Sequence, residues 1–422
     1  MKRRRNIKLD VENICKASKQ ASLSLSIAST SIKNGVLEKA AKNIHSRSKK
    51  ILTANGRDMF HAKKEKISEA LLDRLELNME RVEAMSKGLK DVARLQDPVG
   101  KIIAAWERPN GLKISRVRVP IGTIAIIYES RPNVTADAAG LSLKSGNSSI
   151  LRCGSESLNS STIIAECLRD ALKSFKLPAD CVQLIPTKDR QAVAELLKMD
   201  QYIDIIVPRG GRGLIERVLK ESRIPVIRHL DGICHVYVHS SANLNIARKI
   251  VLNAKMRRPG ICGAAETLLI DENILDSFLP PILDDLIRSG CEVRGGRNIR
   301  SLDPRVKKVK DLDWDTEYLD AIISVKSVSD VSEAIDHISK HGSQHTDSII
   351  SSEAGPTKAF LQKVDSGIVM HNVPTQFADG GEFGMGAEIG ISTGKLHARG
   401  PVGAEQLTTY KYIVKGNGQT RP

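Results

Sequence analysis

The segment Thr123-Ile-Ala-Ile-Ile-Tyr128 is a short apolar run, and the stretch Val134 to Lys144 behind it has apolar residues at helical spacing. A second apolar run, Ser149 to Leu151, and a second helical pattern, Ser160 to Lys173, follow it. Short apolar strands that alternate with helices are typical of a parallel sheet covered on both faces. This stretch therefore predicts a doubly wound α/β domain.

The same alternation continues along the chain. Further strands are predicted at Val182–Ile185, Tyr202–Val207, His235–His239 and Glu266–Ile270. Further helices are predicted at Asp189–Lys198, Gly213–Glu221 and Leu244–Met256. The strand at Glu266 opens a second α/β stretch that runs to about Met370, so the chain is expected to contain two such domains.

The two flanks of this region have different patterns. From Val11 to about Arg94 the apolar residues follow a helical period, which predicts a helical lead-in. The segment Leu112–Pro120 alternates apolar and basic residues, as a half-exposed strand does. The tail Gln406–Val414 also favours a strand, and since no element follows it, we expect it to pair with another subunit.

Charge and composition narrow the function classes. The 422-residue chain has a formal net charge of +15, and residues 1–66 alone hold 17 Lys/Arg against 5 Asp/Glu. Only 3% of the residues are aromatic, and no nucleic-acid-binding motif accompanies the charge, so we expect a solvated basic face and no nucleic-acid partner. The apolar runs are too short to span a membrane, and Met1–Arg5 lack the apolar region of a signal peptide. We therefore expect a cytoplasmic protein with no membrane partner.

One of the seven cysteines lies in an unusual setting. Neither they nor the ten histidines show metal-site spacing, so we expect free thiols and no metal. Four lie in or beside apolar segments, where cysteine packs as a small hydrophobe: Cys153, Cys167, Cys181 and Cys234. Cys262 instead follows Lys255 and Arg258 in a Pro-Gly loop, where positive charge and backbone N–H groups favour the nucleophilic thiolate. Spacing alone leaves open a nucleophile or a loop cysteine without a role.

The residues around Cys262 resemble those of a known family. The stretch Asn253-Ala-Lys-Met-Arg-Arg-Pro-Gly-Ile-Cys262-Gly-Ala-Ala-Glu266-Thr267 closely resembles the active-site segment of the gamma-glutamyl phosphate reductase (glutamate-5-semialdehyde dehydrogenase) family, in the aldehyde dehydrogenase superfamily. Other segments are similar to further blocks of that family: Tyr128–Ala139, Leu143–Asn147, Val207–Gly211, Asp379–Glu382, Gly386–Thr393, Lys395–Ala398 and Leu407–Val414. The match runs from about Ala17 to the end of the chain, and it implies that Cys262 is catalytic.

The resemblance implies an aldehyde dehydrogenase-like α/β fold, with two doubly wound domains and a small β oligomerisation extension. Residues 1–230 are then the cofactor-binding domain with its helical lead-in, except for a strand near 112–119 that belongs to the extension. Residues 231–378 are the catalytic domain that carries Cys262, and residues 379–422 are a C-terminal return with the oligomerisation strand. A homodimer or homotetramer is expected on the same basis.

The resemblance also implies a reaction: the NADPH-dependent reduction of L-glutamyl 5-phosphate to L-glutamate 5-semialdehyde with release of phosphate, the second step of proline biosynthesis. The Cys262 thiolate attacks the acyl phosphate, phosphate leaves, and hydride from NADP(H) reduces the thioester. No kinase segment precedes the match, so a separate glutamate 5-kinase is expected to supply the substrate. The sequence leaves the choice between NADPH and NADH open.

Two segments are implied to bind the cofactor, although no G-x-G-x-x-G motif follows any predicted strand. The adenosine ribose is placed near Arg152, Ser155 and Glu156, and the pyrophosphate or nicotinamide side near Arg209, Gly210 and Gly211. Arg152 is suited to a 2′-phosphate, and the glycines allow close approach of the backbone. The alternative interpretation is that these residues only form turns after strands.

Four residues are candidates for contacts with the substrate or with the oxyanion that forms during the reaction. The Cys262 N–H is the nearest donor for an oxyanion, and Arg131 and Asn133 in the turn after Tyr128 are candidates for a second donor. Glu382, in a Gly-rich loop, is a further candidate, with a solvated loop residue as the alternative.

One departure from the oxidising relatives concerns water. Those relatives carry a Glu-Leu-Gly-Gly segment whose Glu activates water, whereas this chain has His229-Leu230-Asp231-Gly232. The loss of that base agrees with a thioester that is reduced rather than hydrolysed, although a loop difference without mechanistic weight stays open. Two other functions also stay open: an acylating or oxidising aldehyde dehydrogenase with another substrate, and a basic binding protein on the same scaffold.

Overall fold

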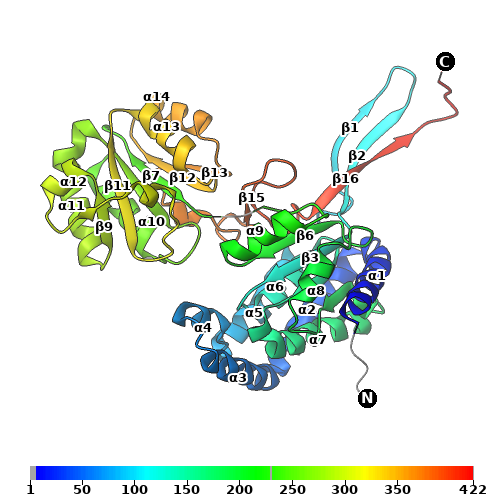
Figure 1. The fold of residues 1–422 in the computed structure, drawn as a ribbon. Coiled ribbons are helices and arrows are strands. Elements are labelled where there is room, and N and C mark those ends of the chain that lie inside the picture. Colours follow the sequence, from blue (N-terminus) through cyan, green and yellow to red (C-terminus); the bar gives the residue numbers. More distant parts are fainter. Residues whose placement is uncertain (1–5, 229–230, 422) are drawn as a thin grey trace. The chain divides into compact units, whose positions relative to one another are not determined.

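The computed structural model describes residues 6–228 and 231–421. The described residues fall into two compact units. In Figure 1 the first is coloured mainly from blue to green and also contains the red C-terminal strand, and the second is coloured mainly from green to orange. Unit 1 lies within Met1–Arg228, Gly384–Gly390 and Val402–Pro422, and unit 2 lies within His229–Phe383 and Ile391–Pro401. The segment expected as a single C-terminal return, residues 379–422, therefore contributes to both units.

Unit 1 begins with the helices of the lead-in, which confirm the helical pattern predicted from Val11 to Arg94. They are α1 (Ile7–Ser26), α2 (Thr30–Ser46), α3 (Ser48–Lys64), α4 (Glu69–Leu75) and α5 (Met79–Arg94). Side chains cap several of them: Asn6, Ser29 and Asn78 each accept a hydrogen bond from the backbone N–H three residues later. Helices α1, α2 and α5 therefore begin where the sequence offers a capping oxygen.

The parallel sheet of unit 1 has the strand order β5-β4-β3-β6. Its strands are β3 (Thr123–Tyr128), β4 (Ser148–Arg152), β5 (Val182–Leu184) and β6 (Ile205–Arg209). The connecting helices are α6 (Val134–Lys144), α7 (Leu158–Ser174), α8 (Gln191–Leu196) and α9 (Arg212–Glu221), with short 3-10 turns at Ser155–Ser157 and Ala179–Cys181. Helices α1 and α8 share a core with the sheet that includes Val11, Ile127 and Leu196. All its strands run in parallel, so their carboxyl ends meet at one edge, where ligands bind in such folds.

The parallel sheet of unit 2 has the order β10-β9-β11-β8-β7-β12-β13. Its strands are β7 (Cys234–Val238), β8 (Ala265–Asp271), β9 (Glu292–Gly295), β10 (Lys307–Lys308), β11 (Ile322–Val328), β12 (Thr346–Ile350) and β13 (Ile368–His371). Its helices are α10 (Leu244–Met256), α11 (Leu275–Arg288), α12 (Arg297–Leu302), α13 (Val331–His341) and α14 (Ala354–Lys363), with 3-10 turns at Glu272–Ile274, Asp311–Asp315 and Thr375–Phe377.

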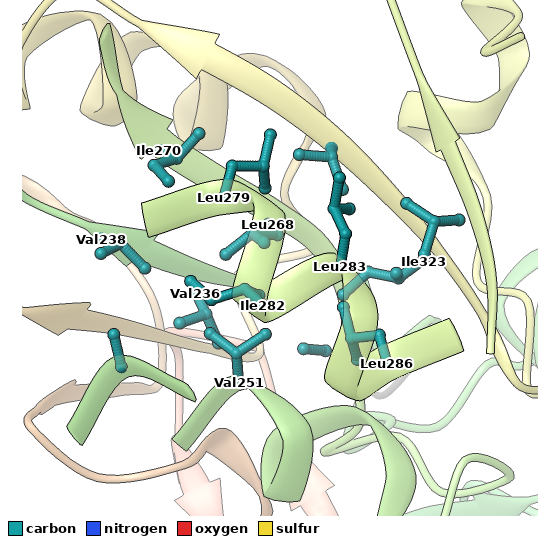
Figure 2. Packing of buried hydrophobic residues seen from close by; sticks show 14 of the residues in the cluster. Val236, Val238, Val251, Leu268, Ile270, Leu279, Ile282, Leu283, Leu286 and Ile323 are labelled. Atoms are coloured by element: carbon teal, nitrogen blue, oxygen red, sulfur yellow. The ribbon is translucent and has the colours of Figure 1, made fainter. Parts of the chain in front are cut away.

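Figure 2 shows how one face of this sheet is covered, with Val251 of α10 and Ile282 of α11 packed toward Leu268 of β8. Burying each such side chain contributes about 1.5–3 kcal/mol. Phe360 of α14 packs with Tyr237 in a separate cluster.

A third, antiparallel sheet in unit 1 has the order β1-β2-β16, with β1 (Ile102–Glu107), β2 (Lys113–Pro120) and β16 (Thr408–Lys415). Strand β2 confirms the strand predicted near 112–119, whereas β1 was not predicted. The tail strand, which was expected to pair with another subunit, pairs with β2 of its own chain from Thr408↔Pro120 to Lys415↔Lys113. Figure 1 shows the two strands side by side. Pairing of the other edge of β16 with another subunit stays a prediction.

A short antiparallel pair, β14 (Ile391–Ser392) and β15 (Gly400–Pro401), belongs to unit 2. Among the residues that the structure describes, no helix combines the length and the apolar composition that a membrane span needs.

Candidate active site

The partly exposed Cys262 lies in the loop 257–264, which joins the end of α10 to the start of β8 and is called the nucleophile loop below. The cysteines predicted to pack as small hydrophobes, Cys153, Cys167, Cys181 and Cys234, are all buried. Burial raises the pKa of Cys153 to about 11 and that of Cys181 to about 12, so both thiols stay protonated near neutral pH. Cys262 therefore differs from them in exposure as well as in sequence context.

Two residues hold the backbone of Cys262, namely Gly232 just before β7 and Cys234 at the start of β7. Gly232 lies so close that a Cβ atom there would be 2.1 Å from the Cys262 carbonyl oxygen and 2.6 Å from its Cα, which leaves room only for glycine. The Sγ of Cys234 donates a hydrogen bond to the same carbonyl at 3.1 Å. Within the loop, the N–H of Ala264 donates to the carbonyl of Ile261. The position of the cysteine backbone is therefore set by close contacts from a neighbouring strand.

A buried ion pair joins the two ends of the nucleophile loop. The Nζ of Lys255 on α10 lies 2.5 Å from Oε2 of Glu266 on β8. The exposed fractions of the two side chains are 0% and 1%. Burial raises the pKa of Glu266 to about 8, although Lys255 opposes this shift. Lys255 therefore pairs with Glu266. The sequence analysis had counted Lys255 only as a positive charge that favours the Cys262 thiolate.

A further carboxylate near the loop was missed by the sequence analysis. Oε1 of Glu317 accepts a hydrogen bond of 2.9 Å from the N–H of Gly232, the residue that packs against Cys262. An acidic residue shortly before a buried strand is too common a pattern to single out. In the segment that was singled out for its missing water-activating carboxylate, Asp231 and Gly232 are described, whereas His229 and Leu230 lie outside the described residues.

Unit 1 contains a cavity of about 420 Å³ at the carboxyl ends of β3 and β4, called the unit 1 cavity below. Its lining includes the predicted residues Arg152, Ser155 and Glu156. It also includes three basic residues that the sequence analysis did not select, Lys188, Arg190 and Arg217. The structure thus brings the residues predicted for the ribose side together in one cavity. The lining of this cavity holds more basic side chains than the sequence analysis predicted.

The polar groups of this cavity differ in how fully they are paired. Arg152 is buried, and its Nε has no hydrogen-bond partner within residues 6–228 and 231–421. Glu156, by contrast, is held by the turn after β3, because its Oε1 accepts from both the N–H and the Oγ of Ser130 at 2.7 Å. Ser130 has a φ of 43°, a left-handed conformation that these two hydrogen bonds help to hold.

The residues predicted for the pyrophosphate side are not among those that line the unit 1 cavity. The N–H of Gly211 donates to Oε2 of Glu129 at 2.9 Å, and Glu129 itself lines the cavity. A Cβ at Gly210 would lie 2.5 Å from the same oxygen. The predicted Arg209, Gly210 and Gly211 therefore adjoin the cavity through Glu129.

The candidates for substrate and oxyanion binding form local contacts. The Nδ2 of Asn133 donates to Asp137 at 3.0 Å, and the carbonyl of Arg131 accepts from the N–H of Val134. Glu382 is exposed, and its N–H donates to Asp379 at 3.3 Å. Their roles stay predictions. Among the described residues, no group of three or more His, Cys, Asp or Glu side chains is arranged to hold a metal ion.

Similarity to known proteins agrees with this site. The model of the aldehyde dehydrogenase family matches residues 3–289. A gamma-glutamyl phosphate reductase from Paramagnetospirillum magneticum is 56% identical over 405 residues, which cover 96% of this chain and 96% of that protein. The chain belongs to the gamma-glutamyl phosphate reductases of the aldehyde dehydrogenase family. Another reductase of that name, from Rhodospirillum rubrum, is 54% identical over 97% of this chain and 96% of its own length.

Solved structures support the same family. The crystal structure of gamma-glutamyl phosphate reductase from Thermotoga maritima has a TM-score of 0.96 and 44% identity, and the match covers 98% of this chain and 100% of that one. An acetylating aldehyde dehydrogenase from Geobacillus thermoglucosidasius, at 17% identity and a TM-score of 0.70 over 99% of this chain and 98% of its own, shares the fold. The predicted aldehyde dehydrogenase-like fold is therefore confirmed.

Proposed function

We propose that the chain reduces L-glutamyl 5-phosphate to L-glutamate 5-semialdehyde with NADPH and releases phosphate, as an oxidoreductase of proline biosynthesis. The observation that carries this proposal is the 56% identity, over 96% of the chain, to a gamma-glutamyl phosphate reductase. The partly exposed Cys262 in a firmly held loop agrees with it, because acyl transfer needs an accessible and oriented thiol.

In the proposed first step, the Cys262 thiolate attacks the carbonyl carbon of the acyl phosphate. The bond from carbon to the phosphate oxygen breaks, phosphate leaves with the electron pair, and a thioester forms on Cys262. The backbone N–H of Cys262 is the proposed donor to the oxyanion, with Arg131 or Asn133 as candidates for a second donor. Glu382 remains a candidate contact for the substrate.

The family uses a nicotinamide dinucleotide, which when bound supplies the hydride that reduces the thioester to the aldehyde. The unit 1 cavity fits such a ligand, because buried Arg152 presents an unpartnered Nε in that part of the structure which is described. We assign the 2′-phosphate to Arg152, with Lys188 and Arg190 beside it, and therefore propose that NADPH is preferred.

The other cofactor contacts are proposed from the same cavity. Ser155 and Glu156 lie on the ribose side, although Glu156 is already held by Ser130. Arg209, Gly210 and Gly211 form the neighbouring loop on the pyrophosphate or nicotinamide side, where Glu129 ties Gly211 to the cavity wall.

Several features of the cellular setting belong to the same proposal. The substrate is supplied by a separate glutamate 5-kinase in the cytoplasm, and the enzyme is a homodimer or homotetramer assembled through the β1-β2-β16 sheet. The exposed aromatic side chains of that sheet, Trp106, Tyr410 and Tyr412, support its use as a contact surface.

The reaction run in reverse tests the proposal. Glutamate 5-semialdehyde is incubated with NADP or NAD, with and without phosphate, and the reduced nicotinamide is followed by absorbance. We expect NADP reduction to require phosphate and to be faster than NAD reduction. NADP reduction that does not depend on phosphate would instead identify an oxidising aldehyde dehydrogenase. Cys262→Ser should abolish the signal, whereas Cys291→Ser, a change at a buried cysteine of the same unit, should retain it.

A further inference from the structure

We propose that Cys234 is a positioning residue, whose thiol holds the nucleophile loop in its reactive orientation by donating a hydrogen bond to the carbonyl of Cys262. The inference rests on the proposed role of Cys262 as the nucleophile. Cys234 was expected to be a buried hydrophobe, and its burial is confirmed, but its polar contact gives it a second role.

The sheet brings the two residues together although they are 28 positions apart. Cys234 begins β7 and pairs with Ala265 of β8, three residues after Cys262, and the register shifts by one residue directly after this pair. This pairing places the Cys234 side chain beneath the loop, where its Sγ lies 3.1 Å from the Cys262 carbonyl oxygen. The contact therefore depends on how β7 pairs with β8 at this register shift.

Two observations make Cys234 the donor in this contact. Burial raises the pKa of its thiol well above the usual range, and nearby Asp347 adds to this, so the proton stays on sulfur. The alternative acceptor, Nδ1 of His345, lies farther away at 3.5 Å and is itself 2.8 Å from Oγ1 of Thr346. The shorter contact to the Cys262 carbonyl is the better hydrogen bond.

The contact orients more than one atom because a peptide bond is planar. With the Cys262 carbonyl turned toward Cys234, the N–H of Gly263 in the same trans peptide points the opposite way. Gly232 backs the Cα of Cys262 from the same strand end. The Cα and the carbonyl are thus both fixed, and so is the origin of the Cys262 side chain. Acyl transfer is sensitive to the position of the attacking sulfur, since a misplacement of the reacting groups by about 1 Å can lower the rate about a hundredfold.

The test compares Cys234→Ala with Cys234→Ser, which restores a donor at the same place. Cys291→Ala is the matched control, because it removes another buried thiol from unit 2 that lies near a different carbonyl, that of Glu292. Acylation is followed with p-nitrophenyl acetate, whose ester carbon is attacked by the Cys262 thiolate while p-nitrophenolate leaves in a burst. Alkylation of Cys262 by iodoacetamide, mapped by mass spectrometry, reports how accessible the thiol is. In this reaction the sulfur does not attack a carbonyl carbon, so it does not test the orientation needed for acyl transfer.

We expect Cys234→Ala to slow the burst about 10- to 100-fold, with alkylation changed less than about twofold. Cys234→Ser should return the burst rate to within about threefold of the original protein, and Cys291→Ala should leave it unchanged. The same pattern should appear in kcat of the phosphate-dependent reaction, with KM nearly constant. If Cys234→Ala melts earlier than Cys291→Ala, Cys234→Val takes its place, because it fills the volume without a donor.

Three results would overturn the inference. These are an unchanged burst rate in Cys234→Ala, a Ser variant as slow as the Ala variant, or a burst and an alkylation rate that fall together. A protein that gives the burst but no phosphate-dependent turnover would instead contradict the proposed function and leave the role of Cys234 intact.

Discussion

The unit 1 cavity and the nucleophile loop satisfy their polar groups in opposite ways. Around the cavity, buried Arg152 keeps an Nε without a partner among the described residues. In the nucleophile loop, the Cys262 carbonyl accepts a hydrogen bond from Cys234, and on the two elements that flank the loop Lys255 pairs with Glu266. A ligand-binding site can leave a hydrogen-bond donor for which the ligand supplies the acceptor. A nucleophile that must stay in place is instead held by contacts within the protein. This difference can be tested from both sides.

The largest effect is expected from breaking the buried ion pair. Glu266 is protonated in the folded unit near neutral pH, and Lys255→Met leaves it buried without its hydrogen-bond partner, which should lower the stability of unit 2 by about 3 kcal/mol. Urea unfolding of unit 2 can be followed through Trp314 alone in a Trp106→Phe background, because these are the two tryptophans of the chain. An unchanged midpoint would mean that the pair does not hold the loop. The added change Glu266→Leu should recover part of the loss, since it removes the unpaired group.

The next effect concerns the tight fit behind the nucleophile. Gly232→Ala places a methyl group 2.1 Å from the Cys262 carbonyl oxygen, so the loop must move. We expect kcat to fall about a hundredfold, which corresponds to about 2.7 kcal/mol of transition-state stabilisation. Gly355→Ala, in α14 of the same unit, is the matched control, because its Cβ would meet nothing within 4 Å. Equal activity in the two variants would show that the loop tolerates displacement.

On the cavity side, Arg152→Gln removes the charged donor proposed for the 2′-phosphate. We expect the Kd of NADPH to rise about 30-fold, close to the roughly 2 kcal/mol typical of a hydrogen bond to a charged group. The Kd of NADH should change less than about threefold, since it lacks that phosphate. Fluorescence titration of the reduced nicotinamide measures both, with the exposed Arg57→Gln as control. A parallel loss for both cofactors would assign Arg152 to another part of the ligand.

The smallest effect, taken per unit of pH, is a dependence of stability on pH. Glu266 has a pKa of about 8 in the folded unit and about 4.5 as its ordinary value, so between these pH values only the folded state keeps the proton. Its contribution is complete below about pH 4.5 and is lost as the pH rises through about 8, at no more than about 1.4 kcal/mol per pH unit. Urea midpoints of unit 2 at several pH values measure this slope. Glu266→Gln should flatten it, and an unchanged slope would assign it to other groups.

Much of the fold was predictable because its signals are local. The helix expected at Leu244–Met256 is found with those bounds, and so is the strand at Thr123–Tyr128. Strand β1 was not predicted, because its residues do not alternate between apolar and polar side chains and nearly all of them are exposed. The strands β2 and β16 were both recognised and assigned to one extension, but their direct pairing was not predicted, since residue spacing says nothing about the register that places Tyr410 opposite Arg118.

The sequence by itself determined the alternation of strands and helices from Thr123 to Ile270, the unusual setting of Cys262 and the family to which its neighbourhood belongs. Period and motif carry that information over a few residues at a time. Only the tertiary structure decided that Lys255 pairs with Glu266, that Cys234 contacts the Cys262 carbonyl, and that Lys188 joins Arg152 in one cavity. These contacts depend on sheet order and strand register, which place residues from separate segments within hydrogen-bonding distance.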